Sequence, residues 1–312
     1  MSQSDLPITR HVPIQTVAIV GAGLIGASWA ALFTAGGVDV TVWDPDAAAR
    51  AAFKAKVAAA RKQLSQLGLR GRGKIKLFSR LKPAVSDADL VQENAPEKID
   101  LKRRLYAEIF SAAPDAIIAS STSSFAWSDL TEGVARASQI VVAHPFNPPH
   151  LVPLVELFGT DDAIVKRVMA FYEKLGKVPV RMKKEAPGHI ANRLASALYR
   201  EAVNIVAEGI ADVADVDRAL VEGPGLRWSI QGAHMTYHLG GGEGGIRHYL
   251  DHLGPSQEKR WASLGNPRLT PEVKDAIVRG VEAEAAGRSI ADLSAERDAA
   301  LLATLKLRAK LR

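Results

Sequence analysis

Short apolar runs alternate with longer stretches of helical spacing through the first part of the chain. The runs have the length and the Val, Ile and Leu content of buried strands. Strands that alternate with helices build a parallel sheet with helices on both faces. The pattern therefore predicts an α/β fold with a doubly wound sheet. We expect its strands at residues 16–20, 38–43, 75–78, 89–93, 116–120, 139–144, 151–158 and 177–182.

The pattern changes near Pro187, after which long helical segments replace the alternation. The first of these segments carries an apolar stripe at helical spacing, formed by Ile190, Leu194, Leu198, Ala202 and Ile205. The sequence therefore predicts two domains, the sheet domain at residues 1–187 and an all-α domain at residues 188–312.

Asn192 lies away from this stripe. At ~100° per residue it points about 200° from Ile190, with Ser196 and Tyr199 on its own side of the helix. From there its amide could donate a hydrogen bond to a substrate carbonyl. An exposed Asn in the first turn of a helix is the ordinary alternative, because Asn is common near helix starts.

A glycine-rich segment follows the first predicted strand. Thr16–Val20 leads into Gly21, Ala22, Gly23, Leu24, Ile25 and Gly26, and then into an Ala-rich helical stretch. Glycines at this spacing between a strand and a helix bind the pyrophosphate of a dinucleotide. Gly21 permits the tight turn, Gly23 lets the backbone approach the phosphates, and Gly26 allows close helix packing. We expect a Rossmann-type domain.

Asp44 ends the next predicted strand, 18 residues after Gly26. An acid at this point accepts hydrogen bonds from both ribose hydroxyls of an adenosine and repels a 2′-phosphate. The alternative is an ordinary turn residue, since Pro45 follows it. With the strand context, Asp44 favours NAD over NADP as the cofactor.

His144 and Glu156 are candidates for a catalytic pair. The apolar runs at 140–143 and 151–157 are separated by a Pro-rich turn, which would fold the second run back beside the first. A carboxylate on one ring nitrogen fixes the tautomer and stabilises the imidazolium, so that the other nitrogen can take a proton from an alcohol. The alternative is a surface His with a solvated Glu.

The composition is that of a globular protein of two domains, with 312 residues, 47% of them hydrophobic, and no cysteine. The absence of cysteine excludes disulfides, thiolate nucleophiles and Cys-ligated metals, and no His or carboxylate cluster has a metal-binding spacing, so we expect no metal. No run of 18 apolar residues is present, and the start of the chain lacks the apolar core of a signal peptide. We expect no membrane span and a cytoplasmic location.

The net charge is +6, and residues 61–82 hold eight basic side chains and no acid. This stretch could bind a phosphate-rich ligand such as a coenzyme A tail, or RNA. It lacks interleaved aromatic residues, however, and basic residues around a turn are usually solvated. We therefore do not expect nucleic acid as a partner.

The aromatic residues of the second predicted domain all carry a polar group: Tyr199, Trp228, Tyr237, Tyr249 and Trp261. The faces of Trp and Tyr bind quaternary ammonium groups and other cations. Packing in the core is the competing interpretation for each ring. The glycine run 240–245 has no preceding strand and is interpreted as a flexible connector.

Taken together, these motifs resemble the short-chain L-3-hydroxyacyl-CoA dehydrogenase family over nearly the whole chain. The matching residues are Gly21 to Gly26, Asp44, Glu97, Lys102, Ser123, the His144-Pro-Phe-Asn-Pro block, Glu156 and Pro187 to Leu194. The resemblance implies a Rossmann domain, a helical dimerisation domain that forms a homodimer, and NAD. It also implies that Glu97 and Lys102 flank the cofactor, that Asn147 lies near the nicotinamide, and that Ser123 hydrogen-bonds the substrate hydroxyl.

The chain departs from ordinary acyl-CoA members of this family at Ser121, where they carry Asn, and at Gly223–Gly232. The second segment, with Tyr237 and Trp261, resembles the carnitine 3-dehydrogenase branch instead. L-Gulonate 3-dehydrogenase, which is related to lambda-crystallin, is the nearest sister. In this branch Trp228, Tyr237 and Trp261 would receive a trimethylammonium group, and Arg227 would pair with a carboxylate.

The expected activity is the NAD-dependent oxidation of the 3-hydroxyl of a small L-3-hydroxy acid, with L-carnitine as the leading candidate. His144 would act as the base, Glu156 would orient it, and Ser123 and Asn192 would position the substrate. L-Gulonate and a short-chain L-3-hydroxyacyl-CoA are alternative substrates. A crystallin-like structural protein or an RNA-binding protein are the alternatives that are not enzymes.

Overall fold

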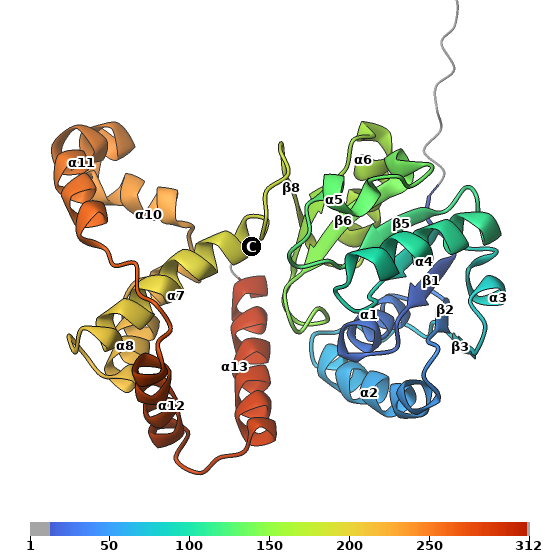
Figure 1. Cartoon of the computed structure of the whole chain (residues 1–312), viewed down its shortest axis with the longest axis horizontal. Helices are drawn as coiled ribbons and strands as arrows, with labels where there is room; N and C mark the ends of the chain where they lie inside the picture. Colours follow the sequence, from blue (N-terminus) through green and yellow to red (C-terminus); the bar gives the residue numbers. More distant parts are fainter. Residues whose placement is uncertain (1–12, 311–312) are drawn as a thin grey trace, which may run out of the picture. The chain divides into compact units, whose positions relative to one another are not determined.

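The computed structural model describes residues 13–310, which form two compact units that divide between Asn192 and Arg193. The first unit is built on one sheet (Figure 1). Its strands are β1 (Val17–Val20), β2 (Val40–Trp43), β3 (Ile75–Phe78), β4 (Leu90–Glu93), β5 (Ile117–Ser120), β6 (Ile140–Pro145), β7 (Leu154–Phe158) and β8 (Val178–Arg181). Each of the expected strands is present, close to its predicted bounds.

The strands lie in the order β3-β2-β1-β4-β5-β6-β7-β8. The strands from β3 to β6 are parallel, β7 runs antiparallel to β6, and β8 is parallel to β7. The order 3-2-1-4-5-6 is that of a doubly wound dinucleotide-binding domain, in which ligands bind outside the carboxyl ends of the strands. The predicted α/β Rossmann-type fold is confirmed.

Helices cover both faces of this sheet (Figure 1). They are α1 (Leu24–Ala35), α2 (Ala47–Ser65), α3 (Lys82–Val85), α4 (Ile99–Ala112), α5 (Trp127–Thr131) and α6 (Asp162–Lys174). Trp29, Phe33 and Tyr172 lie in the core that α1, α2 and α6 form on one face, whereas Tyr106 and Ile109 lie in the core of the other face. The central strands β1, β4, β5 and β6 are therefore buried on both sides, which is why they read as continuous apolar runs, whereas the edge strands β3 and β8 are partly exposed.

The second unit is helical, as predicted, and no strand occurs among residues 193–310. Its helices are α7 (Ala191–Ala207), α8 (Val213–Leu220), α9 (Leu226–Trp228), α10 (Ala233–Gly240), α11 (Gly245–Ser263), α12 (Pro271–Ala285) and α13 (Ile290–Lys310). Gly280 lets α12 lie against α8, since a Cβ there would meet the side chain of Val213 at 2.4 Å. Val203 and Leu302 are buried, but many large apolar side chains of this unit are exposed.

The glycine run 240–245 connects α10 to α11, and its backbone is folded into a compact turn. Gly240 ends α10, Gly242–Gly244 form a 3₁₀ turn, and Gly245 begins α11. A Cβ on Gly241 would lie 1.9 Å from the carbonyl oxygen of Gly245. Glycine is required here because the backbone packs on itself.

The composition and geometry of residues 13–310 bear on membrane spans and metal sites. No helix of this part of the chain is long and apolar enough to cross a membrane. No group of three or more His, Cys, Asp or Glu residues in it could hold a metal ion. The cytoplasmic location stays a prediction.

Candidate active site

The glycine segment forms the turn between β1 and α1. Gly21 has φ +99°, and a Cβ on it would lie 2.7 Å from the carbonyl oxygen of Asn94. A Cβ on Gly26 would lie 1.9 Å from the carbonyl oxygen of Gly21, so the first turn of α1 approaches the loop as closely as the motif requires. Gly23 is the N-cap of α1, with no side-chain cap and no atom within 4 Å of a Cβ placed there. The open space beside these amides fits a pyrophosphate.

Asp44 lies beside this turn because β2 is the neighbour of β1. Its carboxylate accepts hydrogen bonds from the backbone N–H of Ala22 at 2.7 Å and of Asp46 at 2.8 Å. Each oxygen retains a lone pair that could accept a ribose hydroxyl. Leu24 and Ile25 form the first turn of α1. These residues fit the adenosine half of NAD.

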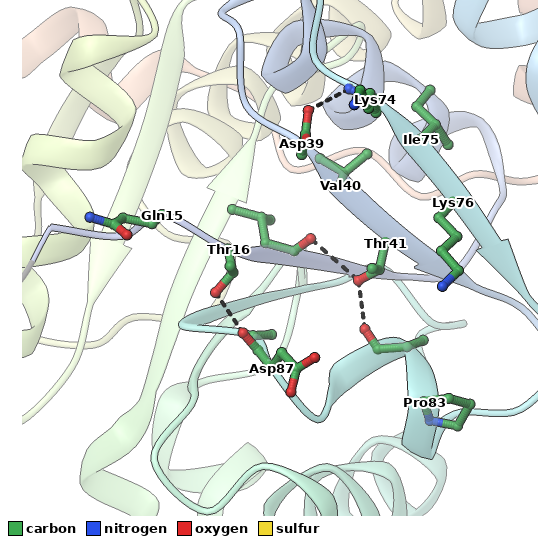
Figure 2. A pocket seen from close by; sticks show the side chains of 13 residues that line it. Gln15, Thr16, Asp39, Val40, Thr41, Lys74, Ile75, Lys76, Pro83 and Asp87 are labelled. Atoms are coloured by element: carbon green, nitrogen blue, oxygen red, sulfur yellow. Dashed lines mark hydrogen bonds between the residues drawn. The ribbon is translucent and has the colours of Figure 1, made fainter.

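A pocket of about 450 Å³ lies at the opposite edge of the sheet. Figure 2 shows Thr16, Asp39 and Lys74 around it, the residues that directly precede β1, β2 and β3. The strands are four residues long, so the pocket is about 13 Å from the glycine turn. None of the candidate site residues lines it. It belongs to the amino ends of the strands and is not the cofactor site.

His144 and Glu156 face each other across the antiparallel pair β6 and β7, where they are direct register partners. The Nδ1 atom of His144 lies 2.8 Å from Oε2 of Glu156, and the residues are 4% and 1% exposed. The other carboxylate oxygen, Oε1, accepts the backbone N–H groups of Ile190 at 2.7 Å and Ala191 at 2.8 Å. The start of α7 therefore holds the carboxylate in place.

These contacts determine the charge of Glu156. Burial alone would raise its pKa, but the hydrogen bond to His144 and the amides of Ala191 and Ile190 hold the pKa below its ordinary value. The ionised carboxylate can only accept a hydrogen bond, so Nδ1 of His144 carries the proton. In the neutral imidazole Nε2 is then the basic nitrogen, which is the arrangement of a general base.

Glu97 accepts hydrogen bonds from the segment that follows β5, residues 122–124. Its Oε1 atom accepts hydrogen bonds from Oγ1 of Thr122 at 2.6 Å, from N of Ser123 at 2.9 Å and from N of Ser124 at 3.1 Å. Burial would raise the pKa of Glu97, but the hydrogen bond from Thr122, the charge of Lys102 and the hydrogen bonds from the Ser124 hydroxyl and the Ser123 amide hold it below its usual value. Asn192 Nδ2 donates to the carbonyl oxygen of Ser123 at 3.2 Å. Three predicted site residues are thus joined through one loop.

Lys102 is 1% exposed, and its ammonium group points into the interior of the first unit. Its Nζ atom lies 2.8 Å from Oε1 of Glu93 and 3.4 Å from Oε2 of Glu97. Glu93, at the end of β4, is fully buried and also accepts the hydroxyls of Tyr106 and Ser120 at 2.8 Å and 2.7 Å. Sequence reasoning missed Glu93. The feature of the sequence that could have identified it is an acidic residue at the carboxyl end of a buried strand.

Asn147 is exposed on the turn after β6, whereas the following Pro148 and Pro149 are buried. Lys177 binds this turn through its buried Nζ atom, which donates hydrogen bonds to the carbonyl oxygens of Pro149 and Val152. Burial lowers the pKa of Lys177 to about 7. The turn is therefore fixed from the interior, and the side chain of Asn147 remains accessible.

In the second unit, Tyr237 and Trp261 line a pocket of about 520 Å³ between α10 and α11. Tyr249 lies between them in the sequence and packs on Tyr237, with ring centroids 4.9 Å apart. Asp251 and Glu258 also line the pocket, and no described lysine or arginine does. The other two predicted substrate residues, Arg227 and Trp228, are on α9 and do not line it.

His189 is a second residue that sequence reasoning missed as part of the site. It is 2% exposed, and its ring centroid lies 4.9 Å from that of His144. Its Nε2 atom lies 3.2 Å from the carbonyl oxygen of Thr122. Its place between Gly188 and the first helix of the second domain gave no sign of these contacts, which depend on the fold.

Comparison with known proteins agrees with this geometry. A model of the NAD binding domain of 3-hydroxyacyl-CoA dehydrogenase matches residues 16–186, and a model of the C-terminal domain of that enzyme matches residues 188–268. The chain belongs to the 3-hydroxyacyl-CoA dehydrogenase family. It is therefore an oxidoreductase whose cofactor is NAD.

Several relatives of this protein are named L-carnitine dehydrogenase. That of Streptomyces griseus is 47% identical, over 99% of this chain and 95% of its own. That of Pseudomonas aeruginosa is 42% identical, over 94% and 93%.

Two solved structures extend the comparison. One is 5-formyl-3-hydroxy-2-methylpyridine 4-carboxylic acid 5-dehydrogenase, an NAD⁺-dependent dismutase, with a TM-score of 0.82 and 29% identity over 94% of this chain and 98% of its own. The other is (S)-3-hydroxybutyryl-CoA dehydrogenase from Ralstonia eutropha, with a TM-score of 0.60 and 31% identity over 66% and 76%. The family predicted from the sequence is confirmed.

The lowered pKa of Glu156 predicts how this pair affects stability. A carboxylate with a lower pKa in the folded than in the unfolded chain stabilises fully above its ordinary value of 4.5, and this contribution is lost as the pH falls through the folded pKa. The excess unfolding free energy of the wild type over Glu156→Gln should therefore shrink below that pH. Denaturant titrations from about pH 7 to about pH 3 measure it. The surface exchange Glu173→Gln is the control, and an excess that does not vary with pH would contradict the assignment.

Proposed function

We propose that the protein oxidises the C3 hydroxyl of L-carnitine to the ketone, 3-dehydrocarnitine, with NAD as the acceptor. The observation that carries the proposal is the buried pair of His144 Nδ1 and Glu156 Oε2 at 2.8 Å. The substrate follows from the relatives named L-carnitine dehydrogenase, which are 40% to 47% identical to most of the chain. A base that takes a hydroxyl proton is what this oxidation needs from the protein.

His144 performs the proton transfer. Its Nε2 atom accepts the proton of the C3 hydroxyl, and the ring becomes an imidazolium. Glu156 stabilises that charge, because its carboxylate stays ionised and bonds Nδ1. When bound, NAD accepts the hydride that leaves C3. In the reverse direction the imidazolium returns the proton to the ketone oxygen.

Ser123 and Asn192 orient the substrate in this proposal. The Ser123 hydroxyl hydrogen-bonds the substrate oxygen, and Asn192 is held beside it by its bond to the Ser123 carbonyl. Glu97 limits the movement of the loop by accepting its amides. Asn147 would contact the nicotinamide when NAD is bound. Fixing the reacting groups in this way lowers the entropic part of the barrier.

The pocket lined by Tyr237, Tyr249 and Trp261 is proposed to bind the trimethylammonium group. Aromatic faces attract a quaternary ammonium, and Asp251 and Glu258 add negative charge. The chain as a whole carries +6, so a lining with two acids and no described lysine or arginine differs in charge from the chain as a whole. Arg227 and Trp228 are not part of this pocket, and no role for them is proposed.

A short-chain L-3-hydroxyacyl-CoA is the second candidate substrate, favoured by the structural likeness to (S)-3-hydroxybutyryl-CoA dehydrogenase. L-Gulonate is the third. The intact pair of His144 and Glu156 argues for an enzyme over a crystallin-like structural protein.

A substrate panel tests the proposed function. NADH formation or consumption should be fastest with L-carnitine and 3-dehydrocarnitine, and slower with L-gulonate, L-3-hydroxybutyrate and acetoacetyl-CoA. His144→Ala should lower kcat by about 10²- to 10⁴-fold, the usual contribution of a general base, and should still bind NADH. Absorbance at the NADH band gives the rates. Equal or better activity with acetoacetyl-CoA would refute the L-carnitine assignment, and full activity of His144→Ala would refute the base.

The aromatic pocket is tested with Trp261→Leu. Loss of a cation–π contact worth about 0.5 to 2 kcal/mol should raise the KM for L-carnitine by roughly 2- to 30-fold and leave kcat nearly unchanged. L-3-Hydroxybutyrate, which has no ammonium group, is the matched control substrate, and its KM should not change. A parallel rise for both substrates would show that the pocket does not recognise the cation.

The second unit is proposed to form a homodimer. It exposes Leu226, Ile230 and Leu239, among other large apolar side chains. Large exposed apolar patches mark interaction surfaces, and these side chains are proposed to contribute to one.

Light scattering after size exclusion tests the dimer. The wild type should have twice the mass of the chain, and Ile230→Glu with Leu239→Glu should shift it toward the monomer, because burying unpaired charges is costly. Neither residue lines the aromatic pocket. Lys54→Glu, on the exposed face of α2, is the control. A monomeric wild type at micromolar concentration would overturn the proposal.

A further inference from the structure

We infer that His189 is a positioning residue of this oxidation: its ring holds the loop that carries Ser123, packs against the base His144, and sits on the turn that supplies the amides to Glu156. The inference rests on the role of His144 as the base. Nothing in the sequence assigns His189 a function, and its contacts join parts of the site that are far apart in the chain.

The first contact fixes the tautomer of His189. Its Nε2 atom lies 3.2 Å from the carbonyl oxygen of Thr122, and a carbonyl oxygen can only accept. Nε2 therefore carries the proton and donates it. Thr122 directly precedes Ser123, and both are bound by Glu97 on their other side. The loop is thus held from two directions, by a carboxylate and by an imidazole.

The second contact is with the base. The rings of His189 and His144 are 4.9 Å apart and tilted by 41°. A second charge so close would oppose protonation of the base. Burial, then the proximity of His144, lowers the pKa of His189, although the Thr122 carbonyl and the carboxylates of Glu156 and Glu97 act in the opposite direction. His189 therefore packs against His144 as a neutral ring.

The third contribution comes from the backbone. Gly188 and His189 are successive left-handed residues, with φ +74° and +54°. A histidine in this region is uncommon, and such a conformation persists only where its surroundings fix it. This turn directs the next two backbone N–H groups, those of Ile190 and Ala191, onto Oε1 of Glu156. The bond to Thr122 keeps the turn in place.

Two variants separate the donor from the ring. His189→Phe keeps a ring of similar size against His144 but cannot donate to Thr122, whereas His189→Gln keeps an amide donor and loses the ring. Both place a residue with a Cβ at the same left-handed position, so their backbone strain is comparable. His252→Phe, at an exposed position of α11, is the control for loss of a histidine.

We expect His189→Phe to lower kcat/KM for L-carnitine by about ten- to a hundredfold. The variant leaves the buried carbonyl oxygen of Thr122 without its hydrogen-bond donor, which is costly, so the loop that carries Ser123 is no longer held in place. His189→Gln should recover most of this loss, and the affinity for NADH, measured by fluorescence, should be unchanged in both. Wild-type activity of His189→Phe would overturn the inference. Equal losses in both variants would also overturn it, since the bond to Thr122 would then not matter. Thermal melts report any general loss of folding, which would lower both the activity and the NADH affinity.

The outcome can be separated from the substrate proposal. If the wild type is inactive on L-carnitine but oxidises another member of the panel, the same comparison is made with that substrate. The L-carnitine assignment would then have failed. The ratio of the kcat/KM of His189→Phe to that of His189→Gln, measured with the other substrate, would still decide the role of His189.

Discussion

A buried carboxylate at the start of a helix is the interaction on which the site depends. Glu156 lies on an interior strand, and burying its charge would be costly without compensation. The imidazole of His144 and two amides at the start of α7 provide that compensation. One ionised group therefore orients the base, stabilises its protonated form and joins the sheet to the first turn of α7. The chemistry and the fold share the same three hydrogen bonds.

Much of this arrangement could be predicted from the sequence, because it depends on local pattern. Strands appear as apolar runs, and the glycine turn is specified by spacing within six residues. The pairing of His144 with Glu156 follows from a hairpin, in which strand register places the two residues opposite each other. Helical spacing indicated Asn192, and the family resemblance supplied Glu97 and Ser123; the structure joins the three through one loop.

What the sequence did not predict depends on contacts between distant segments. Glu93 looks like any acid at a strand end, and only the fold brings Lys102, Tyr106 and Ser120 to it. The burial of Lys102 could not be predicted from the sequence either, since its ammonium group is buried against Glu93, which is on a different element. Trp228 lies on α9 and does not line the pocket that Tyr237 lines, so the expected role of Trp228 in binding the substrate stays a prediction.

The position of Glu156 at the start of a helix has a consequence for folding. Its Oε1 atom accepts the N–H groups of Ile190, which directly precedes α7, and of Ala191, the first residue of α7. The first N–H groups of a helix have no partner within the helix, and an acceptor placed there stabilises it. The carboxylate that orients the base therefore also caps α7, so a substitution of Glu156 would remove a helix cap together with the partner of His144.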